Sequence, residues 1–208
     1  MDTPEITEAM DALKARMVPG RRTILGIAGA PGSGKSTFAA WIRQQFEPGL
    51  AVVVPMDGFH LGNAIIDDTP LRQRKGAIDT FDAGGYLSLL RRLARRDEPV
   101  VYAPEFRRTI DEPVAASIAI PADVPLVITE GNYLLAEQDP WKEIRAQLDE
   151  VWFVDTPQAL RLSRLVERHM LFGMDGAAAV AWANGPDEAN AVLIQGTRRA
   201  ADRIIPWD

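Results

Sequence analysis

The sequence predicts an α/β fold with a mostly parallel central sheet and helices on both of its faces. Apolar, β-branched runs such as 50–55 (LAVVVP) and 125–129 (PLVIT) are typical of strands that are buried on both sides. Segments with helical spacing separate these runs along the chain. Strands that alternate with helices favour a parallel sheet, because each helix carries the chain back across one face of the sheet.

The remaining elements follow in order along the chain. A first helix is expected after Thr3, a favoured N-cap residue, with Pro4 at the first helical position. Its apolar stripe at helical spacing consists of Ile6, Met10, Leu13 and Met17. We expect strands at 23–28, 50–55, 125–129, 151–154 and 203–205. We expect helices at 35–46, 87–96, 141–148, from 157 to about 172, and from about 186.

The segment between the second strand and the 125–129 strand is less regular. Residues 100–103 and 116–120 are expected as short strands at the edges of a small excursion. Residues 61–82 have few periodic features and are expected to form a long loop. A loop of this length in a compact domain is more often functional or separately folded than idle.

Length and charge limit the classes of function. The 208 residues predict a single domain, 1–208, and 23 basic against 29 acidic residues give a net charge of −6. Such a chain is a poor electrostatic match for nucleic acid or an anionic membrane surface. No apolar run approaches the roughly 18 residues of a membrane helix, and the acidic start does not resemble a secretory signal. We therefore expect a cytoplasmic protein without a nucleic-acid partner or membrane insertion.

Cysteine and histidine content limits the chemistry. The chain has no cysteine, which excludes a disulfide framework, a thiolate nucleophile and a thiolate zinc site. His60 and His169 are its only histidines, so a multi-histidine metal site is excluded as well. No heptad pattern or symmetric patch defines an oligomeric state, and a homodimer stays open as an alternative.

A glycine-rich segment carries the clearest functional signal. Residues 29–37 (GAPGSGKST) match G-x-x-x-x-G-K-[ST] between an expected strand and an expected helix. Glycines let successive N–H groups face one anion-sized hollow, and the following helix points its positive end at the same phosphate. Lys35 would then reach the β- and γ-phosphates, and the Ser36 hydroxyl would ligate magnesium. The predicted nucleotide-binding residues are Gly29, Ala30, Pro31, Gly32, Ser33, Gly34, Lys35, Ser36 and Thr37.

Missing motifs disfavour other nucleotide-binding classes. The chain has no N-K-x-D tetrapeptide for reading guanine and no L-S-G-G-Q-type signature. It is also shorter than most motor or transporter ATPases with accessory domains. These features favour a small-molecule kinase over switch GTPases and transport ATPases.

Two acidic residues lie where parallel sheets bind ligands, beyond the carboxyl ends of strands. Asp57 closely follows the 50–55 run, and Glu130 directly follows the 125–129 run. Asp57 is placed to accept a proton from an acceptor hydroxyl during phosphoryl transfer, and Glu130 to hold magnesium or its water shell. Taken alone, Asp57 also fits a turn aspartate before glycine, and Glu130 fits an acid at the start of a helix.

Four segments carry a resemblance to a known family: 29–37 (GAPGSGKST), 56–60 (MDGFH), 129–135 (TEGNYLL) and 155–169 (DTPQALRLSRLVERH). In these segments the chain resembles the P-loop kinase group that includes uridine kinase, phosphoribulokinase and bacterial pantothenate kinase. Within that group it is most similar to the bacterial kinases named for fructose transport. The resemblance implies a P-loop NTPase fold, ATP and Mg²⁺, Asp57 as catalytic base, an acceptor-binding insertion at about 61–120 and a helical lid at about 160–185.

Arginines in the expected lid helix form a candidate phosphate clamp. Arg161, Arg164 and Arg168 occupy positions i, i+3 and i+7, which places them on one helical face. The resemblance implies that Arg164 and Arg168 act in catalysis and that Arg161 lies nearer the acceptor. The alternative is a solvated basic face paired with Glu167. A second arginine cluster at 91–96, for which we find no acidic partner, is expected to be a solvated helix face.

The resemblance places acceptor-binding groups after Asp57. Asp79 matches a segment in which the group has an acceptor-contacting acid and is the first choice for holding substrate hydroxyls. Phe106 matches an aromatic residue of uridine kinase, but Asp111 stands where that enzyme has a base-contacting histidine, which disfavours a nucleoside. His60 fits either an acceptor-orienting group or a histidine packed at a strand end. The candidates are His60, Asn63, Arg74, Lys75, Asp79, Phe106, Arg107 and Arg108, with Arg161 from the lid.

Three functions stay open from the sequence. The first is an ATP-dependent kinase acting on a hydroxyl of a small polar metabolite such as a sugar, vitamin or nucleoside. The second is a kinase for a phosphorylated acceptor such as a nucleotide, which would need a second anion site. The third is a non-catalytic ATP-sensing regulatory module, which needs no acceptor base. Residues that could form the second anion site are Arg74, Lys75, Arg107 and Arg108.

Overall fold

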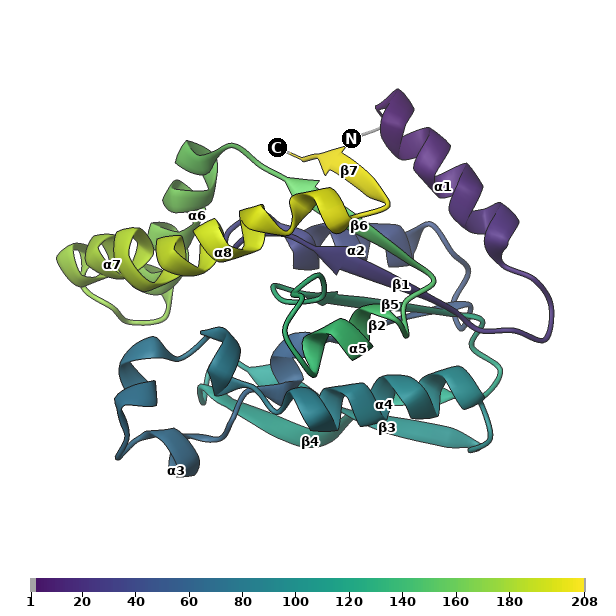
Figure 1. Ribbon diagram of the computed structural model, residues 1–208, viewed down its shortest axis with the longest axis horizontal. Helices are drawn as coiled ribbons and strands as arrows, with labels where there is room; N and C mark the ends of the chain where they lie inside the picture. The colour runs from purple at the N-terminus through teal and green to yellow at the C-terminus, as the bar shows by residue number, and fades with distance from the viewer. Residues whose placement is uncertain (1–2, 208) are drawn as a thin grey trace.

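A five-stranded parallel sheet forms the centre of the molecule (Figure 1). The computed structural model describes residues 3–207. The strand order is β2-β5-β1-β6-β7, and each neighbouring pair is parallel, as the sequence predicts. The strands are β1 (Thr23–Ala28), β2 (Ala51–Pro55), β5 (Leu126–Gly131), β6 (Glu150–Asp155) and β7 (Arg203–Pro206).

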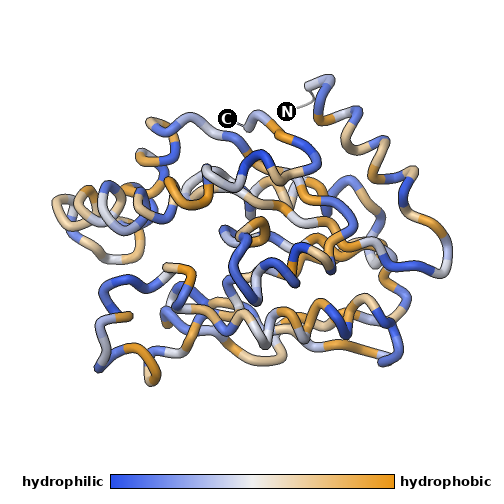
Figure 2. The backbone as a smooth tube through the Cα atoms, viewed as in Figure 1, coloured by the Kyte–Doolittle hydropathy of each residue, from blue (hydrophilic) through white to orange (hydrophobic). Residues whose placement is uncertain are grey.

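Helices cover both faces of this sheet. On one face α1 (Pro4–Arg16) and α2 (Lys35–Gln44) pack on Leu25, Ile27 and the other strand residues that point to their side. On the opposite face α4 (Ala83–Arg95), α5 (Trp141–Arg145) and α8 (Glu188–Gly196) contribute to a second core. In Figure 2, hydrophobic and hydrophilic positions alternate along α1 and α4, as expected for helices with one face on a core.

The 61–82 segment is not a plain loop, which corrects the sequence prediction. It holds the short helix α3 (Asn63–Ile66) and two 3₁₀ turns, Pro70–Arg74 and Ile78–Thr80. The Asp82 side chain then caps α4 by accepting from the Gly85 amide, so this helix begins at Ala83, four residues before the predicted start. Runs this short carry too few repeats for periodicity to identify them.

The predicted short strands are longer and pair with each other. β3 (Val100–Arg107) and β4 (Glu112–Pro121) form a separate antiparallel hairpin that packs below α4 in Figure 1. Val101, Ala103 and Ile120 join the core on that side of the sheet. The hairpin therefore belongs to the same packed body as the sheet, and its tip extends toward α3.

Three helical segments form the region after β6. α6 (Gln158–Leu171) is followed by α7 (Gly176–Trp182) and by a π-helical turn (Ala183–Asp187) that leads into α8. α7 has no separate helix in the sequence prediction, although it lies inside the helical lid expected at about 160–185. The predicted helix from about 186 corresponds to α8, which starts at Glu188. No helix within 3–207 is long and apolar enough to cross a membrane.

The second arginine cluster does have acidic partners, so the expectation that it lacked them was wrong. Arg91 pairs with Glu143 on α5, and Arg92 pairs with Glu98 beyond the helix. Neither acid lies three or four residues from its arginine, which are the spacings at which a helical sequence pattern indicates an ion pair. The arginine side chains are nevertheless substantially exposed, in agreement with a solvated face.

Candidate active site

The 29–37 segment forms a tight turn between β1 and α2. Gly32 and Gly34 have φ values of +76° and +83°, where side chains are strained. A Cβ atom on Gly32 would lie 2.5 Å from the Arg161 carbonyl oxygen. The Ser33 hydroxyl is buried and has no hydrogen-bond partner among the described residues. A turn with this backbone and an unpaired buried hydroxyl suits a phosphate ligand.

Lys35 is the buried positive charge of this turn. Its side chain is almost inaccessible, with 8% relative exposure, and Nζ donates one hydrogen bond, to the Ala30 carbonyl oxygen at 3.2 Å. Burial lowers the pKa of Lys35, and the charges of Glu130 and Asp57 oppose that shift. An ammonium group has three donors, so two N–H groups are available for phosphate oxygens.

Ser36 and Glu130 bring two oxygen ligands together. The Ser36 hydroxyl donates to Glu130 Oε1 at 2.9 Å, across the gap between α2 and the end of β5. Burial raises the pKa of Glu130, and the nearby charge of Asp57 raises it further. A hydroxyl and a carboxylate are hard oxygen ligands of the type Mg²⁺ binds together with phosphate oxygens and water. The donor set therefore fits a magnesium ion.

Asp57 lies beside Glu130 at the same edge of the sheet. The β2–β5 register pairs Pro55 with Glu130, and Asp57 is in the short 3₁₀ turn that follows β2 (Met56–Phe59). Its side chain is 29% exposed, and Oδ2 lies 3.6 Å from the Arg108 guanidinium. A partly accessible carboxylate beside a phosphate-binding turn can accept a proton from a bound hydroxyl.

His60 packs at the end of this turn. Its Nδ1 donates to the Asp57 carbonyl oxygen at 2.7 Å, and its ring centroid lies 4.6 Å from that of Phe106, with the two planes tilted by 45°. Burial lowers the pKa of His60, which favours the neutral ring, although the Asp57 carboxylate opposes the shift. With Nδ1 as the donor, Nε2 of the neutral ring is a hydrogen-bond acceptor. The packing of the ring agrees with a histidine at a strand end, and the acceptor-orienting role stays a prediction.

One cavity of about 490 Å³ joins the phosphate-binding turn to the segments around it. Ten of the candidates from the sequence line it: Pro31, Lys35, Ser36, Asp57, His60, Lys75, Phe106, Arg108, Glu130 and Arg168. Arg108 lines it from the hairpin tip and Arg168 lines it from α6. Arg168 forms no hydrogen bond or ion pair with its guanidinium within 3–207, and burial lowers its pKa. Its free guanidinium is available to an anion in the cavity.

The comparisons identify the family of the chain. No family model matches it. It is 32% identical to a Schizosaccharomyces pombe protein named "Putative uridine kinase" over 84% of this chain and 79% of that protein. It is 36% identical to an "ATP-dependent kinase-like protein" of Aspergillus versicolor over 73% of this chain and 93% of that one.

A solved structure from Silicibacter sp. TM1040, described as a "putative fructose transport system kinase", has 36% identity and a TM-score of 0.86, and the match covers 97% of this chain and 98% of that one. The chain belongs to the P-loop kinases of the uridine kinase and phosphoribulokinase group. It is therefore an ATP-dependent phosphotransferase with the P-loop kinase fold.

Five residues predicted at the acceptor lie outside the cavity of this kinase: Asn63, Arg74, Asp79, Arg107 and Arg161. Asp79 is at the surface and forms an ion pair with Arg74, so the choice of Asp79 as a substrate ligand does not agree with its position. Arg107 is exposed near Glu105, because successive side chains of a strand alternate and Phe106 takes the inward position. Arg161 is buried, with 3% relative exposure.

Arg161 and Arg164, two arginines of the expected lid helix, have different surroundings. Arg161 donates to the Pro31 carbonyl oxygen at 3.1 Å and to Glu188 at 3.2 Å, so it ties α6 to the phosphate-binding turn and to α8. Arg164 does not line the cavity, and its Nη1 is buried without a partner among the described residues. Its Nη1 lies 3.6 Å from the position a Cβ on Gly34 would take, next to the phosphate-binding turn.

Several cavity residues were not selected from the sequence. His169 Nε2 and Asp187 Oδ2 lie 2.7 Å apart, and both side chains line the cavity from the lid. Asn132 and Asn190 line it as uncharged polar groups. Asn132 lies inside the 129–135 motif, which was a usable signal. His169 and Asp187 are 18 positions apart on different helical segments, so no local pattern connects them.

Proposed function

We propose that this kinase transfers the γ-phosphoryl group of ATP to a hydroxyl of a small polar metabolite, such as a sugar, a vitamin or a nucleoside. One observation carries the proposal. Asp57 shares a single cavity with Lys35 and Arg168, so a proton-accepting carboxylate faces a phosphate-binding turn. The kinase relatives support phosphoryl transfer, and the cavity supports a small acceptor.

The transfer step follows from these positions. The acceptor hydroxyl would donate a hydrogen bond to Asp57, which takes the proton as the new O–P bond forms and the bond to the β-phosphate oxygen breaks. Lys35, the amides of the turn and Arg168 would stabilise the charge on the transferred group. Most of the barrier reduction in this chemistry comes from positioning and electrostatics. Arg164 would act beside them only if the lid moves it toward the phosphates.

Magnesium has a matching set of ligands in this chain. Ser36 and Glu130 would hold it, Ser36 directly and Glu130 directly or through water. When bound, Mg²⁺ would offset the negative charge of the triphosphate. The Ser36–Glu130 hydrogen bond brings the two side chains together before any ligand is bound.

An acceptor panel tests the proposed function. ADP release would be measured with ATP and Mg²⁺ alone and then with sugars, vitamins, nucleosides, their phosphate esters and a filtered extract of small metabolites. We expect one class to raise ADP release well above the acceptor-free rate, and ³¹P NMR to show a new phosphate monoester. ATP binding without stimulation by any of these would favour the ATP-sensing module instead.

A further inference from the structure

The acceptor side of the cavity contains basic residues whose charges are already engaged. The basic side chains that line the cavity are Lys35, Arg72, Lys75, Arg108 and Arg168. Lys35 and Arg168 form no ion pair within 3–207, and they are the two basic residues proposed above to stabilise the transferred phosphoryl group. The acceptor side can bind an anion only if Arg72, Lys75 or Arg108 has a hydrogen-bond donor that is not already paired.

Lys75 has no free donor. Its side chain is 10% exposed, and Nζ lies 2.7 Å from Asn63 Oδ1, 2.6 Å from the Asp111 carbonyl oxygen and 2.7 Å from Asp111 Oδ2. An ammonium group has three N–H donors, and these three acceptors use all of them. Lys75 also lies over the Phe106 ring, 5.3 Å from its centroid. An incoming phosphate would therefore have to displace existing contacts.

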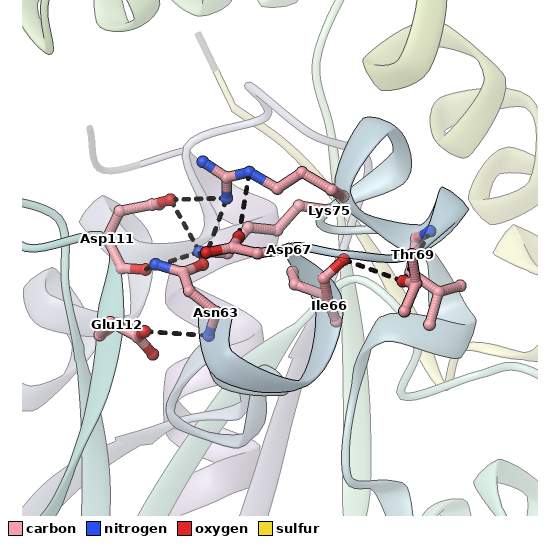
Figure 3. A network of polar contacts seen from close by, with 9 residues as sticks. Asn63, Ile66, Asp67, Thr69, Lys75, Asp111 and Glu112 are labelled. Atoms are coloured by element: carbon pink, nitrogen blue, oxygen red, sulfur yellow. Dashed lines mark hydrogen bonds and ion pairs between the residues drawn. The ribbon is translucent and has the colours of Figure 1, made fainter.

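Arg72 is held by the same network (Figure 3). Its Nη1 donates to Asn63 Oδ1 at 3.2 Å and to Asp111 Oδ2 at 3.4 Å, and its Nε lies 3.4 Å from Asp67. Figure 3 shows Asn63, Lys75 and Asp111 converging from α3, the segment after it and the hairpin tip. Asp111 thus pairs with both basic residues of this wall.

The fold holds Asp111 in position. Asp111 has φ +53°, a left-handed conformation that aspartate tolerates better than most residues, in the turn between β3 and β4. The Asn63 side-chain amide donates to the Asp111 carbonyl oxygen at 3.2 Å, and the Asn63 backbone amide donates to Glu112 at 2.9 Å. These bonds close the segment after Asp57 onto the hairpin tip.

The remaining charges around the acceptor are also paired. Arg108 faces Asp57 at 3.6 Å, and the Asp187 carboxylate forms a hydrogen bond with His169 Nε2 at 2.7 Å. The groups without a charge there are aromatic or polar, as Phe106, Asn132 and Asn190 illustrate. Hydroxyl groups can bond to polar side chains of this kind, whereas a second anion would meet the carboxylates of Asp57, Asp111 and Asp187. Apart from Lys35 and Arg168, the arginine and lysine side chains that line the cavity are already paired.

We infer that Asp111 is a specificity-determining residue that neutralises Lys75 and Arg72, so that the acceptor carries neither a phosphate nor a carboxylate group. This inference rests on the proposed function. If Asp111 has this role, the acceptor is an uncharged, hydroxyl-bearing molecule and not the phosphorylated acceptor that the sequence left open. The predicted anion site formed by Arg74, Lys75, Arg107 and Arg108 does not assemble, because Arg74 and Arg107 lie outside the cavity.

Titration with inorganic phosphate tests the inference. The protein is first saturated with Mg²⁺ and AMP-PNP so that the phosphate-binding turn is filled, and phosphate is then added at constant ionic strength in a calorimeter. We expect no phosphate binding up to about 10 mM by the wild-type chain. We expect Asp111→Asn, which keeps the shape but removes the charge, to bind phosphate at least about tenfold more tightly. The double variant Asp111→Asn/Lys75→Met should lose that binding again.

The other outcomes overturn the inference. Phosphate binding by the wild-type protein that disappears in Lys75→Met would show that Lys75 is an open anion site. An absence of phosphate binding in Asp111→Asn as well would show that Asp111 does not mask Lys75. Arg74→Met is the matched control, since Arg74 is basic and outside the cavity, and circular dichroism melts report folding of each variant. A failed proposed function would instead appear in the acceptor panel, as ATP binding without stimulated ADP release by any acceptor, whatever the phosphate titration shows.

Discussion

Glu130 illustrates how a single residue serves the site at a cost to stability. Its carboxylate is buried at the end of β5, and its one hydrogen bond within 3–207 is with Ser36. Burial and the charge of Asp57 both raise its pKa, so the folded chain holds the ionised form less readily than the unfolded chain does. A metal ion bound at this position would favour the ionised form. The same arrangement that suits magnesium therefore destabilises the protein without ligand.

The Glu130→Gln variant tests this effect through its pH dependence. A raised pKa in the folded state means that the folded protein binds more protons than the unfolded one, so stability falls as pH rises above the ordinary value of 4.5. Glutamine does not ionise and keeps an oxygen that can accept from Ser36. We expect the ligand-free variant to be about 1 kcal/mol more stable than wild type at pH 7 and equal to it near pH 4.

Urea unfolding between pH 4 and pH 8 measures this difference. The exposed Glu137→Gln is the control and should follow the wild-type profile. A Glu130→Gln protein that is less stable than wild type at pH 7 would contradict the account of a strained buried carboxylate.

At the scale of elements, the sequence predicts the parallel strands well and the acceptor segment poorly. β1, β5 and β6 lie within one or two residues of their predicted bounds, because a continuous apolar run has few other ways to be buried. The 61–82 segment depends instead on contacts such as Lys75 with Asp111, which are 36 positions apart. Local patterns do not encode such pairs.

The same distinction applies to the candidate site. Residues that follow strands or lie in the phosphate-binding turn, such as Lys35, Asp57 and Glu130, line one cavity because parallel strands end at one edge. Asp79 was selected by segment resemblance, and the structure turns it to the surface toward Arg74. A residue whose place depends on an irregular segment cannot be oriented from its spacing alone.

The phosphate-binding turn makes a prediction at this scale. Gly32→Ala would place a methyl group 2.5 Å from the Arg161 carbonyl oxygen and would require alanine at φ +76°. We expect it to cost about 3 kcal/mol or more of stability and to abolish nucleotide binding. Gly49→Ala is the matched control, because its φ is +88° and nothing lies within 4 Å of the added atom.

Thermal unfolding and calorimetry with Mg²⁺ and AMP-PNP compare the two glycine variants. Gly49→Ala should cost only about 1 kcal/mol of stability and keep wild-type affinity for the nucleotide. Both variants place alanine at a positive φ, but only Gly32→Ala also brings a methyl group against the Arg161 carbonyl oxygen. Equal losses of stability and nucleotide affinity in the two variants would show that the close approach of Gly32 to α6 does not cause the effect.

Arg161 makes a second prediction about elements. It is buried between α6, the phosphate-binding turn and α8, and it donates to both Pro31 and Glu188. We expect Arg161→Met to lower the free energy of unfolding by about 2–3 kcal/mol and to weaken nucleotide binding. The exposed Arg199→Met should change neither quantity. If Arg161→Met kept full stability while losing acceptor affinity alone, the acceptor role predicted from the sequence would be restored.

At the scale of the whole molecule, this acidic chain places two basic side chains without ion-pair partners among the described residues in one cavity. Its net charge is −6, yet Lys35 and Arg168 face the cavity without ion-pair partners in the described residues. The carboxyl edge of the sheet, the hairpin tip and the lid helices all contribute side chains to that cavity. The fold thus brings a phosphate-binding turn and a carboxylate from distant parts of the sequence to a common space, which is what a phosphotransferase requires.

The Asp57→Asn variant tests this claim most directly. Calorimetry would measure its affinity for Mg²⁺ and AMP-PNP, and ADP release would measure its turnover with the acceptor identified in the panel. Because asparagine keeps the shape of the side chain but cannot take the proton, we expect nucleotide affinity to stay within about threefold of wild type and kcat to fall about a thousandfold or more. Turnover near the wild-type value in a variant that binds nucleotide normally would contradict the role of Asp57 as the base.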